Sequence, residues 1–187
     1  MKKIIFTSLV FFVFMSLLMF PEETATQTSP TSPTSPAPTV KEAGGEWYAY
    51  IDYNGPYNDM QKQINAFISE FFGQGLIPAG PSLSLYYNSS EGTKPEDLKW
   101  AFGFIVSPDC APKAPIKKME LKKQLAIVYL HKGPYENLSK SYELAWNFVK
   151  DQGYKAIWPV YDKYLNNPME VLPKDLETEI VIPVEKK

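Results

Sequence analysis

Apolar and polar residues divide the chain into three zones. Residues 4–20 form an uncharged, almost wholly apolar run behind Lys2 and Lys3. Residues 21–44 carry a Ser/Thr/Pro repeat with almost no apolar side chain, whereas residues 45–187 show the mixed pattern of a globular domain. The run over residues 4–20 has the length and the flanking lysines of a signal peptide or of a signal anchor, and the pattern leaves both open.

The two lysines predict that the N-terminus stays on the cytoplasmic side and that the rest of the chain is exported. The Ser/Thr/Pro zone cannot bury enough apolar surface to offset its chain entropy, so we expect a disordered linker over residues 21–44. We therefore expect one folded domain over residues 45–187. It is either anchored to a membrane and facing outward, or periplasmic or secreted after signal cleavage.

The sequence of this domain repeats itself after 78 residues. The tripeptide Gly55-Pro56-Tyr57 returns as Gly133-Pro134-Tyr135. Chance does not supply many further matches in one register, so we interpret the domain as a duplication with halves of about 46–107 and 121–185. Other matches at this offset are Gln74-Gly75 with Gln152-Gly153, Pro81 with Pro159, Tyr86 with Tyr164, Asn88 with Asn166, and Asp97 with Asp175.

Each half shows the same order of local patterns. A β-prone run precedes each Gly-Pro-Tyr, an apolar face at helical spacing follows it, and two more β-prone runs complete the half. Each helical pattern stops at a glycine, Gly75 or Gly153, which suits a C-terminal cap. This order predicts an α+β fold in which duplicated β-α-β-β units form an antiparallel sheet with both helices on one face. The expected strands are 47–53, 82–88, 99–106, 121–131, 157–165 and 177–184.

Alternation along the strands predicts which side chains share a face of the sheet. Leu83 and Leu85 are expected to face the helices, which turns Ser84 and Tyr86 to the opposite face. The repeat register then places Asp162 and Tyr164 on that opposite face as well. Glu179 joins them, because Ile180 and Ile182 are expected to face the helices. These residues predict a ligand cleft that lies on the face away from the helices.

Composition removes several classes of function. The net charge of −2 gives no basic footprint for nucleic acid, and no stretch is a helix-turn-helix candidate, so we expect no nucleic-acid partner. The one cysteine, Cys110, permits no intramolecular disulfide and no cysteine-based metal cluster. We therefore predict neither a metal site nor a cofactor. The aromatic share of 14% favours a pocket or an interface lined by rings.

Three blocks of this domain carry a resemblance to a known family: residues 131–135 (HKGPY), 161–168 (YDKYLNNP) and 177–184 (ETEIVIPV). They resemble the signature blocks of the GyrI-like family, also described as the effector-binding domain of bacterial multidrug-responsive transcription activators. The resemblance covers the chain from about Trp47 to its end. It implies a tandem strand-helix-strand-strand architecture and a cleft, lined by aromatic side chains around an acidic residue, that binds bulky hydrophobic and often cationic compounds. By position, Asp162 stands where the family usually has glutamate, Tyr164 matches the family's tyrosine, and Glu179 matches its second glutamate.

Three functions remain open at this point. The leading one is an exported domain that senses or sequesters hydrophobic, cationic organic compounds, with Glu179, Asp162, Tyr164, Tyr86 and Ser84 as ligand-binding residues. The second is a hydrolase of cyclopropane-bearing or electrophilic small molecules, which a subset of the family resembles. In it Glu179 or Asp162 activates water and Tyr164 donates a proton. It ranks lower because Asp162 is one methylene shorter than the usual glutamate. The third is a protein-interaction module, with a protein partner that the sequence does not name.

Overall fold

The computed structural model describes residues 37–187. Within this range the chain forms nine strands and two α-helices, joined by short 3-10 turns. The helices are α1 (Met60–Gly73) and α2 (Leu138–Asp151). The strands are β1 (Thr39–Ala43), β2 (Trp47–Asn54), β3 (Ser82–Tyr86), β4 (Lys99–Val106), β5 (Lys117–Glu120), β6 (Gln124–Lys132), β7 (Tyr154–Ala156), β8 (Val160–Tyr164) and β9 (Glu177–Lys186).

The duplication predicted from the sequence is confirmed. Helices α1 and α2, strands β3 and β8, and strands β4 and β9 each begin 78 residues apart. The repeated asparagines hold the same loop in both halves. Asn88 Nδ2 donates to the Asp97 carbonyl at 2.8 Å, and Asn166 Nδ2 donates to the Asp175 carbonyl at 2.8 Å. Each half is therefore one β-α-β-β unit, as expected, and the α+β fold class is correct.

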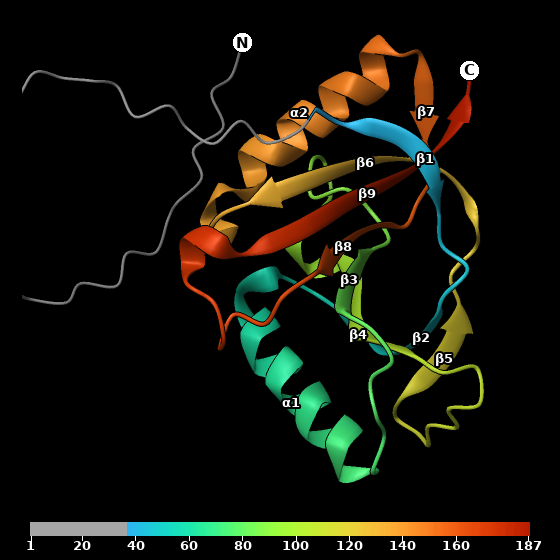
Figure 1. The fold of residues 1–187 in the computed structure, drawn as a ribbon, viewed down its shortest axis with the longest axis vertical. Coiled ribbons are helices and arrows are strands. Elements are labelled where there is room, and N and C mark those ends of the chain that lie inside the picture. The colour runs from blue at the N-terminus through green and yellow to red at the C-terminus, as the bar shows by residue number, and fades with distance from the viewer. Residues whose placement is uncertain (1–36) are drawn as a thin grey trace, which may run out of the picture. The chain divides into compact units, whose positions relative to one another are not determined.

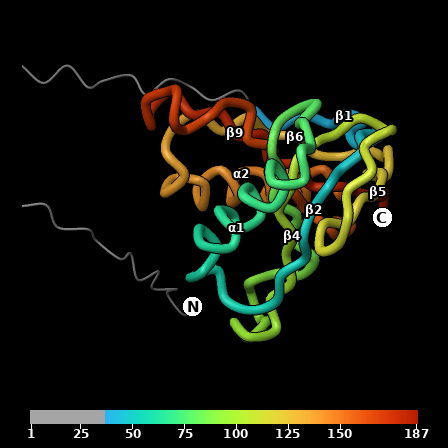
Figure 2. The backbone as a smooth tube through the Cα atoms, turned by 90° about the horizontal axis from the view of Figure 1, so that it is seen from below, coloured from blue at the N-terminus to red at the C-terminus, as the bar shows by residue number. Residues whose placement is uncertain are grey.

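The helices end where the sequence indicates. Gly75 and Gly153 have φ angles of +72° and +70°, a left-handed conformation that glycine adopts without steric cost. The predicted apolar faces are also the buried ones, because Phe67 and Phe71 of α1 and Ala145 of α2 pack against the sheet. Both helices lie on one side of the domain, with β1 and β5 on the other (Figures 1 and 2).

The strands follow the order β1-β6-β9-β8-β3-β4-β2-β5, with β7 paired to β9. The two ends of this order are joined by chain continuity. Strand β1 leads directly into β2 and β5 leads into β6, while β1 pairs with β6 and β2 pairs with β5. The strand pairs β1–β6 and β2–β5 therefore lie at the two ends of the sheet. The segments that join these two ends run on the side away from the helices (Figure 1).

This connection buries the second face of the central strands. Leu83 and Leu85 of β3 are fully buried in one apolar cluster with Tyr48 of β2 and Val128 of β6. The cluster is separate from the two clusters that contact α1 and α2. The central strands are therefore covered on both faces, by helices on one and by the joined strands on the other.

The predicted faces of β3 and β8 were consequently wrong. Ser84 pairs with Phe102 and Asp162 pairs with Ile180, and both partners belong to the clusters under the helices. Ser84, Tyr86, Asp162 and Tyr164 thus lie on the helix face, and Leu83 and Leu85 lie on the other. The assignment failed because two buried faces are both apolar, so leucine does not distinguish them.

The predicted start of the domain at residue 45 was also wrong. Residues 39–43, which were assigned to the linker, form strand β1 and pair with Gln124–Val128 of β6. The predicted signal segment over residues 1–20 lies outside the described residues. Between residues 37 and 187, no helix is long and apolar enough to cross a membrane.

Candidate functional site

A buried carboxylate marks the centre of the helix face. Asp162 of β8 is 1% exposed. Its Oδ1 accepts a hydrogen bond from the Tyr142 hydroxyl of α2 at 2.7 Å, and its Oδ2 accepts one from the Tyr86 hydroxyl of β3 at 3.2 Å. The six ion pairs of residues 37–187 do not include Asp162. This carboxylate is therefore held by neutral hydroxyls and not by a cation.

The two halves exchange hydrogen bonds across their boundary. Tyr86 of the first half donates to Asp162 of the second, and Tyr164 of the second half donates to Ser84 Oγ of the first at 3.0 Å. Tyr86 and Tyr164 are equivalent in the repeat, as are Ser84 and Asp162. This exchange of hydrogen bonds is thus two-fold symmetric in its donors, and its two acceptors differ, because one is Ser84 and the other is Asp162.

Aromatic rings surround this pair of hydrogen bonds. The Tyr57 ring meets the Tyr86 ring edge-on at a centroid distance of 5.8 Å, and Tyr135 meets Tyr164 in the same way at 5.5 Å. Tyr57 and Tyr135 are the tyrosines of the two Gly-Pro-Tyr turns. The turns therefore contribute to the site. We name Ser84, Asp162 and these five tyrosines (57, 86, 135, 142 and 164) the tyrosine–aspartate cluster.

Burial changes the protonation of the cluster. Loss of hydration raises the pKa of Asp162 to about 7, and the hydrogen bonds from Tyr142 and Tyr86 oppose this rise. Burial also raises the pKa values of Tyr86, Tyr142 and Tyr164, and the nearby Asp162 carboxylate raises them further. The tyrosines therefore stay neutral donors, while Asp162 exchanges its proton near neutral pH.

Glu179 lies apart from this cluster. It pairs with Lys163 in the β8–β9 register, on the face away from the helices, and its Oε1 accepts a hydrogen bond from Lys41 Nζ of β1 at 2.8 Å. Tyr164 faces the helices. The expectation that Glu179 shares a site with Asp162, Tyr164, Tyr86 and Ser84 is therefore wrong in its geometry. The suggested pairing of Glu179 and Tyr164 in a hydrolase fails for the same reason.

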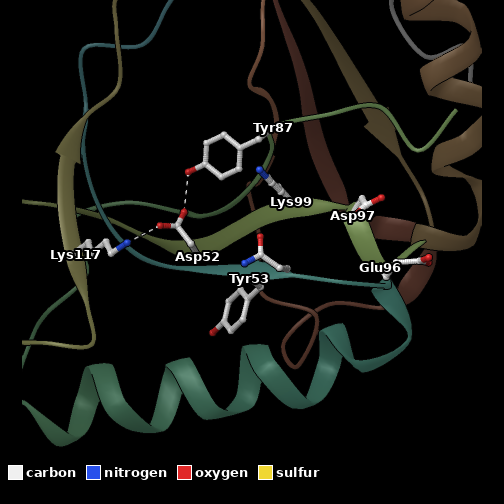
Figure 3. A pocket seen from close by; sticks show the side chains of 8 residues that line it. Asp52, Tyr53, Tyr87, Glu96, Asp97, Lys99 and Lys117 are labelled. Atoms are coloured by element: carbon white, nitrogen blue, oxygen red, sulfur yellow. Dashed lines mark hydrogen bonds and ion pairs between the residues drawn. The ribbon is translucent and has the colours of Figure 1, made fainter. Parts of the chain in front are cut away.

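A separate open pocket of about 520 Å³ lies on the same side as Glu179 but at β2 and β5 (Figure 3). Its centre is Asp52, which accepts hydrogen bonds from the Tyr87 hydroxyl at 3.1 Å and from Lys117 Nζ at 2.9 Å. The Lys117 side chain is 63% exposed, so water competes for this ion pair. The pocket is a solvated polar hollow and lacks the buried, cation-free carboxylate of the tyrosine–aspartate cluster.

Sequence reasoning missed Tyr142, Tyr57 and Tyr135 as members of the site. Helical spacing places the Tyr142 ring on the apolar face of α2, where it packs, but spacing says nothing about its hydroxyl. One general signal was present, because the hydroxyl of a buried tyrosine usually has a hydrogen-bond partner. The sole histidine, His131, has a structural role, since Nε2 donates to the Pro134 carbonyl and Nδ1 forms a hydrogen bond with the Ser141 hydroxyl at 2.7 Å.

The described part of the chain contains no group of three or more His, Cys, Asp or Glu residues arranged to hold a metal ion. The tyrosine–aspartate cluster instead offers one negative charge, neutral hydroxyl donors and aromatic rings. Carboxylates and the faces of aromatic rings are, in general, the groups that attract organic cations.

Known structures share this architecture. The C-terminal domain of EcmrR is 22% identical, with a TM-score of 0.71, and the match covers 80% of this chain and 98% of that domain. A conserved protein from Listeria innocua is 12% identical, with a TM-score of 0.62, over 80% of this chain and 92% of that one. The protein SAV2435, solved bound to tetraphenylphosphonium, is 15% identical, with a TM-score of 0.53, and the match covers 79% of this chain and 93% of that one.

The match to full EcmrR is partial. In its complex with DNA, 57% of the EcmrR chain is covered, with 21% identity and a TM-score of 0.70. Among curated proteins no sequence matches the chain. A family model does match, over residues 37–185, and its description is the GyrI-like small molecule binding domain. The chain therefore belongs to the GyrI-like small-molecule-binding family.

Proposed function

We propose that this domain binds hydrophobic organic cations at the tyrosine–aspartate cluster. The observation that carries the proposal is the carboxylate of Asp162, which is 1% exposed and has no cationic partner among the described residues. An ionised carboxylate in such surroundings is costly unless a positive charge approaches it. A ligand cation supplies that charge, and the surrounding rings add about 0.5–2 kcal/mol of cation–π attraction.

Binding requires the cluster to open. Tyr142 and Tyr86 occupy both carboxylate oxygens, so a cation that contacts Asp162 must displace at least one hydroxyl. All five tyrosines of the cluster are only partly buried, whereas Asp162 and Ser84 are fully buried. A ligand therefore enters by moving tyrosine side chains, without breaking the sheet. That SAV2435 was solved with a bound phosphonium cation supports this choice of ligand class.

The test compares two ions of the same shape and opposite charge. We expect tetraphenylphosphonium to bind and tetraphenylborate not to bind, as measured by isothermal titration calorimetry. Asp162→Asn is expected to weaken phosphonium binding by at least about tenfold, which corresponds to 1.4 kcal/mol. Affinity should rise as the pH increases through 7, because the cation competes with the proton on Asp162.

Asp52→Asn is the matched control, since it removes the carboxylate of the open pocket in Figure 3. It should leave phosphonium affinity unchanged. Equal binding of both ions, or phosphonium binding that survives Asp162→Asn, would show that this carboxylate does not anchor a cation.

We also propose that the domain works outside the cytoplasm. The support is the apolar run over residues 4–20 behind two lysines, followed by a Ser/Thr/Pro-rich stretch. Expression with a C-terminal epitope, followed by protease treatment of intact cells or spheroplasts, should degrade the domain. Protection of the epitope until the cells are lysed would contradict export, and the mass of the purified chain would show whether the N-terminal segment is cleaved.

A further inference from the structure

Two fully buried polar side chains flank the tyrosine–aspartate cluster without a hydrogen-bond partner among the described residues. They are Trp100, through its indole Nε1–H, and Thr178, through its hydroxyl. Both residues are 0% exposed. They lie 78 positions apart, so each is the repeat equivalent of the other. Buried polar groups are nearly always paired, and an unpaired one needs a reason.

Their positions relate them to the cluster in the same way. Trp100 pairs with Tyr86 in the β3–β4 register, and its ring lies 6.4 Å from that of Tyr57. Thr178 pairs with Tyr164 in the β8–β9 register, and Tyr164 packs against Tyr135. Each half therefore places two tyrosine rings and one unpaired polar group beside the boundary where Asp162 lies.

The burial of these groups costs folding free energy that a simple apolar residue would avoid. Valine in place of Thr178 would fill the same volume without an unpaired hydroxyl. Because both halves carry such a group at the same position, we expect the partner of each group to arrive from outside the domain. The opening of the cluster, which moves Tyr57 or Tyr135, would bring that partner within reach.

We infer that the ligand is an aromatic cation with a hydrogen-bond acceptor, such as a carbonyl oxygen, that receives the indole N–H of Trp100, and a second polar group that pairs with the Thr178 hydroxyl. This inference rests on the proposed function, and it adds two polar groups of the ligand to the positive charge that the proposed function already requires. The acceptor is specified at Trp100 because an indole N–H only donates. A site with such groups discriminates against analogues that leave them unpaired.

The experiment uses two phosphonium cations that differ at one place, where one has a carbonyl oxygen and the other has a methylene group. (4-Acetylphenyl)triphenylphosphonium carries a carbonyl, and (4-isopropenylphenyl)triphenylphosphonium has the same shape without an acceptor. With the full chain, we expect the acetyl compound to bind about tenfold more tightly. This advantage should disappear in Trp100→Phe and persist in Thr178→Val. A second acetyl group on another ring should add affinity only while Thr178 is present.

A second measurement does not depend on the folding of a variant. In the ¹⁵N-labelled wild-type chain, one indole N–H resonance should shift downfield with the acetyl compound and not with its isopropenyl analogue. Equal affinities of the two cations would overturn the inference and leave the proposed function intact. Loss of the advantage in Thr178→Val alone would overturn the assignment to Trp100. Failure of every phosphonium to bind would overturn both proposals.

Discussion

Gly103→Ala is expected to destabilise the domain by roughly 3 kcal/mol or more, a large part of the stability of a domain of this size. Gly103 lies in β4 opposite Tyr50 of β2 and Leu83 of β3. A Cβ atom at this position would lie 2.0 Å from the Ala49 carbonyl oxygen and 2.8 Å from the Tyr50 Cα. These are backbone atoms of a strand that is paired on both sides, so neither can move without breaking a ladder.

The control is the same change at Gly73, the last residue of α1. A Cβ there meets nothing within 4 Å, and its φ is not positive. Gly73→Ala should be neutral or stabilising by up to about 1 kcal/mol, because alanine loses less conformational freedom on folding. Urea unfolding followed by circular dichroism measures both variants. A Gly103→Ala midpoint within error of that of Gly73→Ala would mean that β2 yields where we expect it to be fixed.

Gly103 also shows how far a sequence repeat predicts a structure. Its equivalent in the second half is Val181, which is buried in β9 without difficulty. The repeat predicts the same strand at both positions, and this is correct. It does not predict that a Cβ atom at residue 103 would collide with the backbone of β2, because that contact depends on the path of β2 between its two neighbours, β4 and β5.

Local patterns predicted the elements well, because each depends on nearby residues. The helical faces around Phe67 and Ala145 and the glycine caps follow from spacing and backbone conformation alone. Strand β1 escaped notice because four of its five side chains are exposed and its sequence, TVKEA, has no buried stripe. Pairing with β6 stabilises it, and pairing between segments distant in sequence leaves no local signal.

The site was half predictable for a related reason. Ser84, Tyr86, Asp162 and Tyr164 were grouped correctly, because the repeat register and strand alternation tie them together. The face of the sheet on which they lie was predicted wrongly. Leu83 and Ser84 are both fully buried, so neither face of β3 is exposed to solvent and alternation cannot tell the two faces apart. Glu179 was placed correctly on the face away from the helices, and it was grouped with the other four residues because they were wrongly placed on that face. Its true partner, Lys41, lies in the strand that the sequence did not reveal.

The second large effect concerns Asp162 and pH. Its pKa is about 7 in the folded domain and about 3.9 in an unfolded chain, so the folded state binds more protons between these values. Stability from this group is therefore fully present below pH 4 and is lost as the pH rises through 7. Three pKa units correspond to about 4 kcal/mol, which we take as an upper value.

Asp162→Asn removes this titration while keeping a group that can hydrogen bond with Tyr142 and Tyr86. The variant should be less stable than wild type or equal to it at pH 4, and more stable at pH 8. The measurement is the free energy of unfolding in urea at each pH, expressed as the difference between the two proteins, because this difference cancels the contributions of the other titrating groups.

Tyr142→Phe is the control, because it should move the titration of Asp162 in a known direction. Loss of its hydroxyl removes a hydrogen bond that lowers the pKa of Asp162, so the pH at which stability is lost should move upward. A difference between wild type and Asp162→Asn that stays constant from pH 4 to pH 8 would show that Asp162 remains ionised in the folded domain. The carboxylate would then hold a permanent charge, and a cationic ligand would bind without releasing a proton.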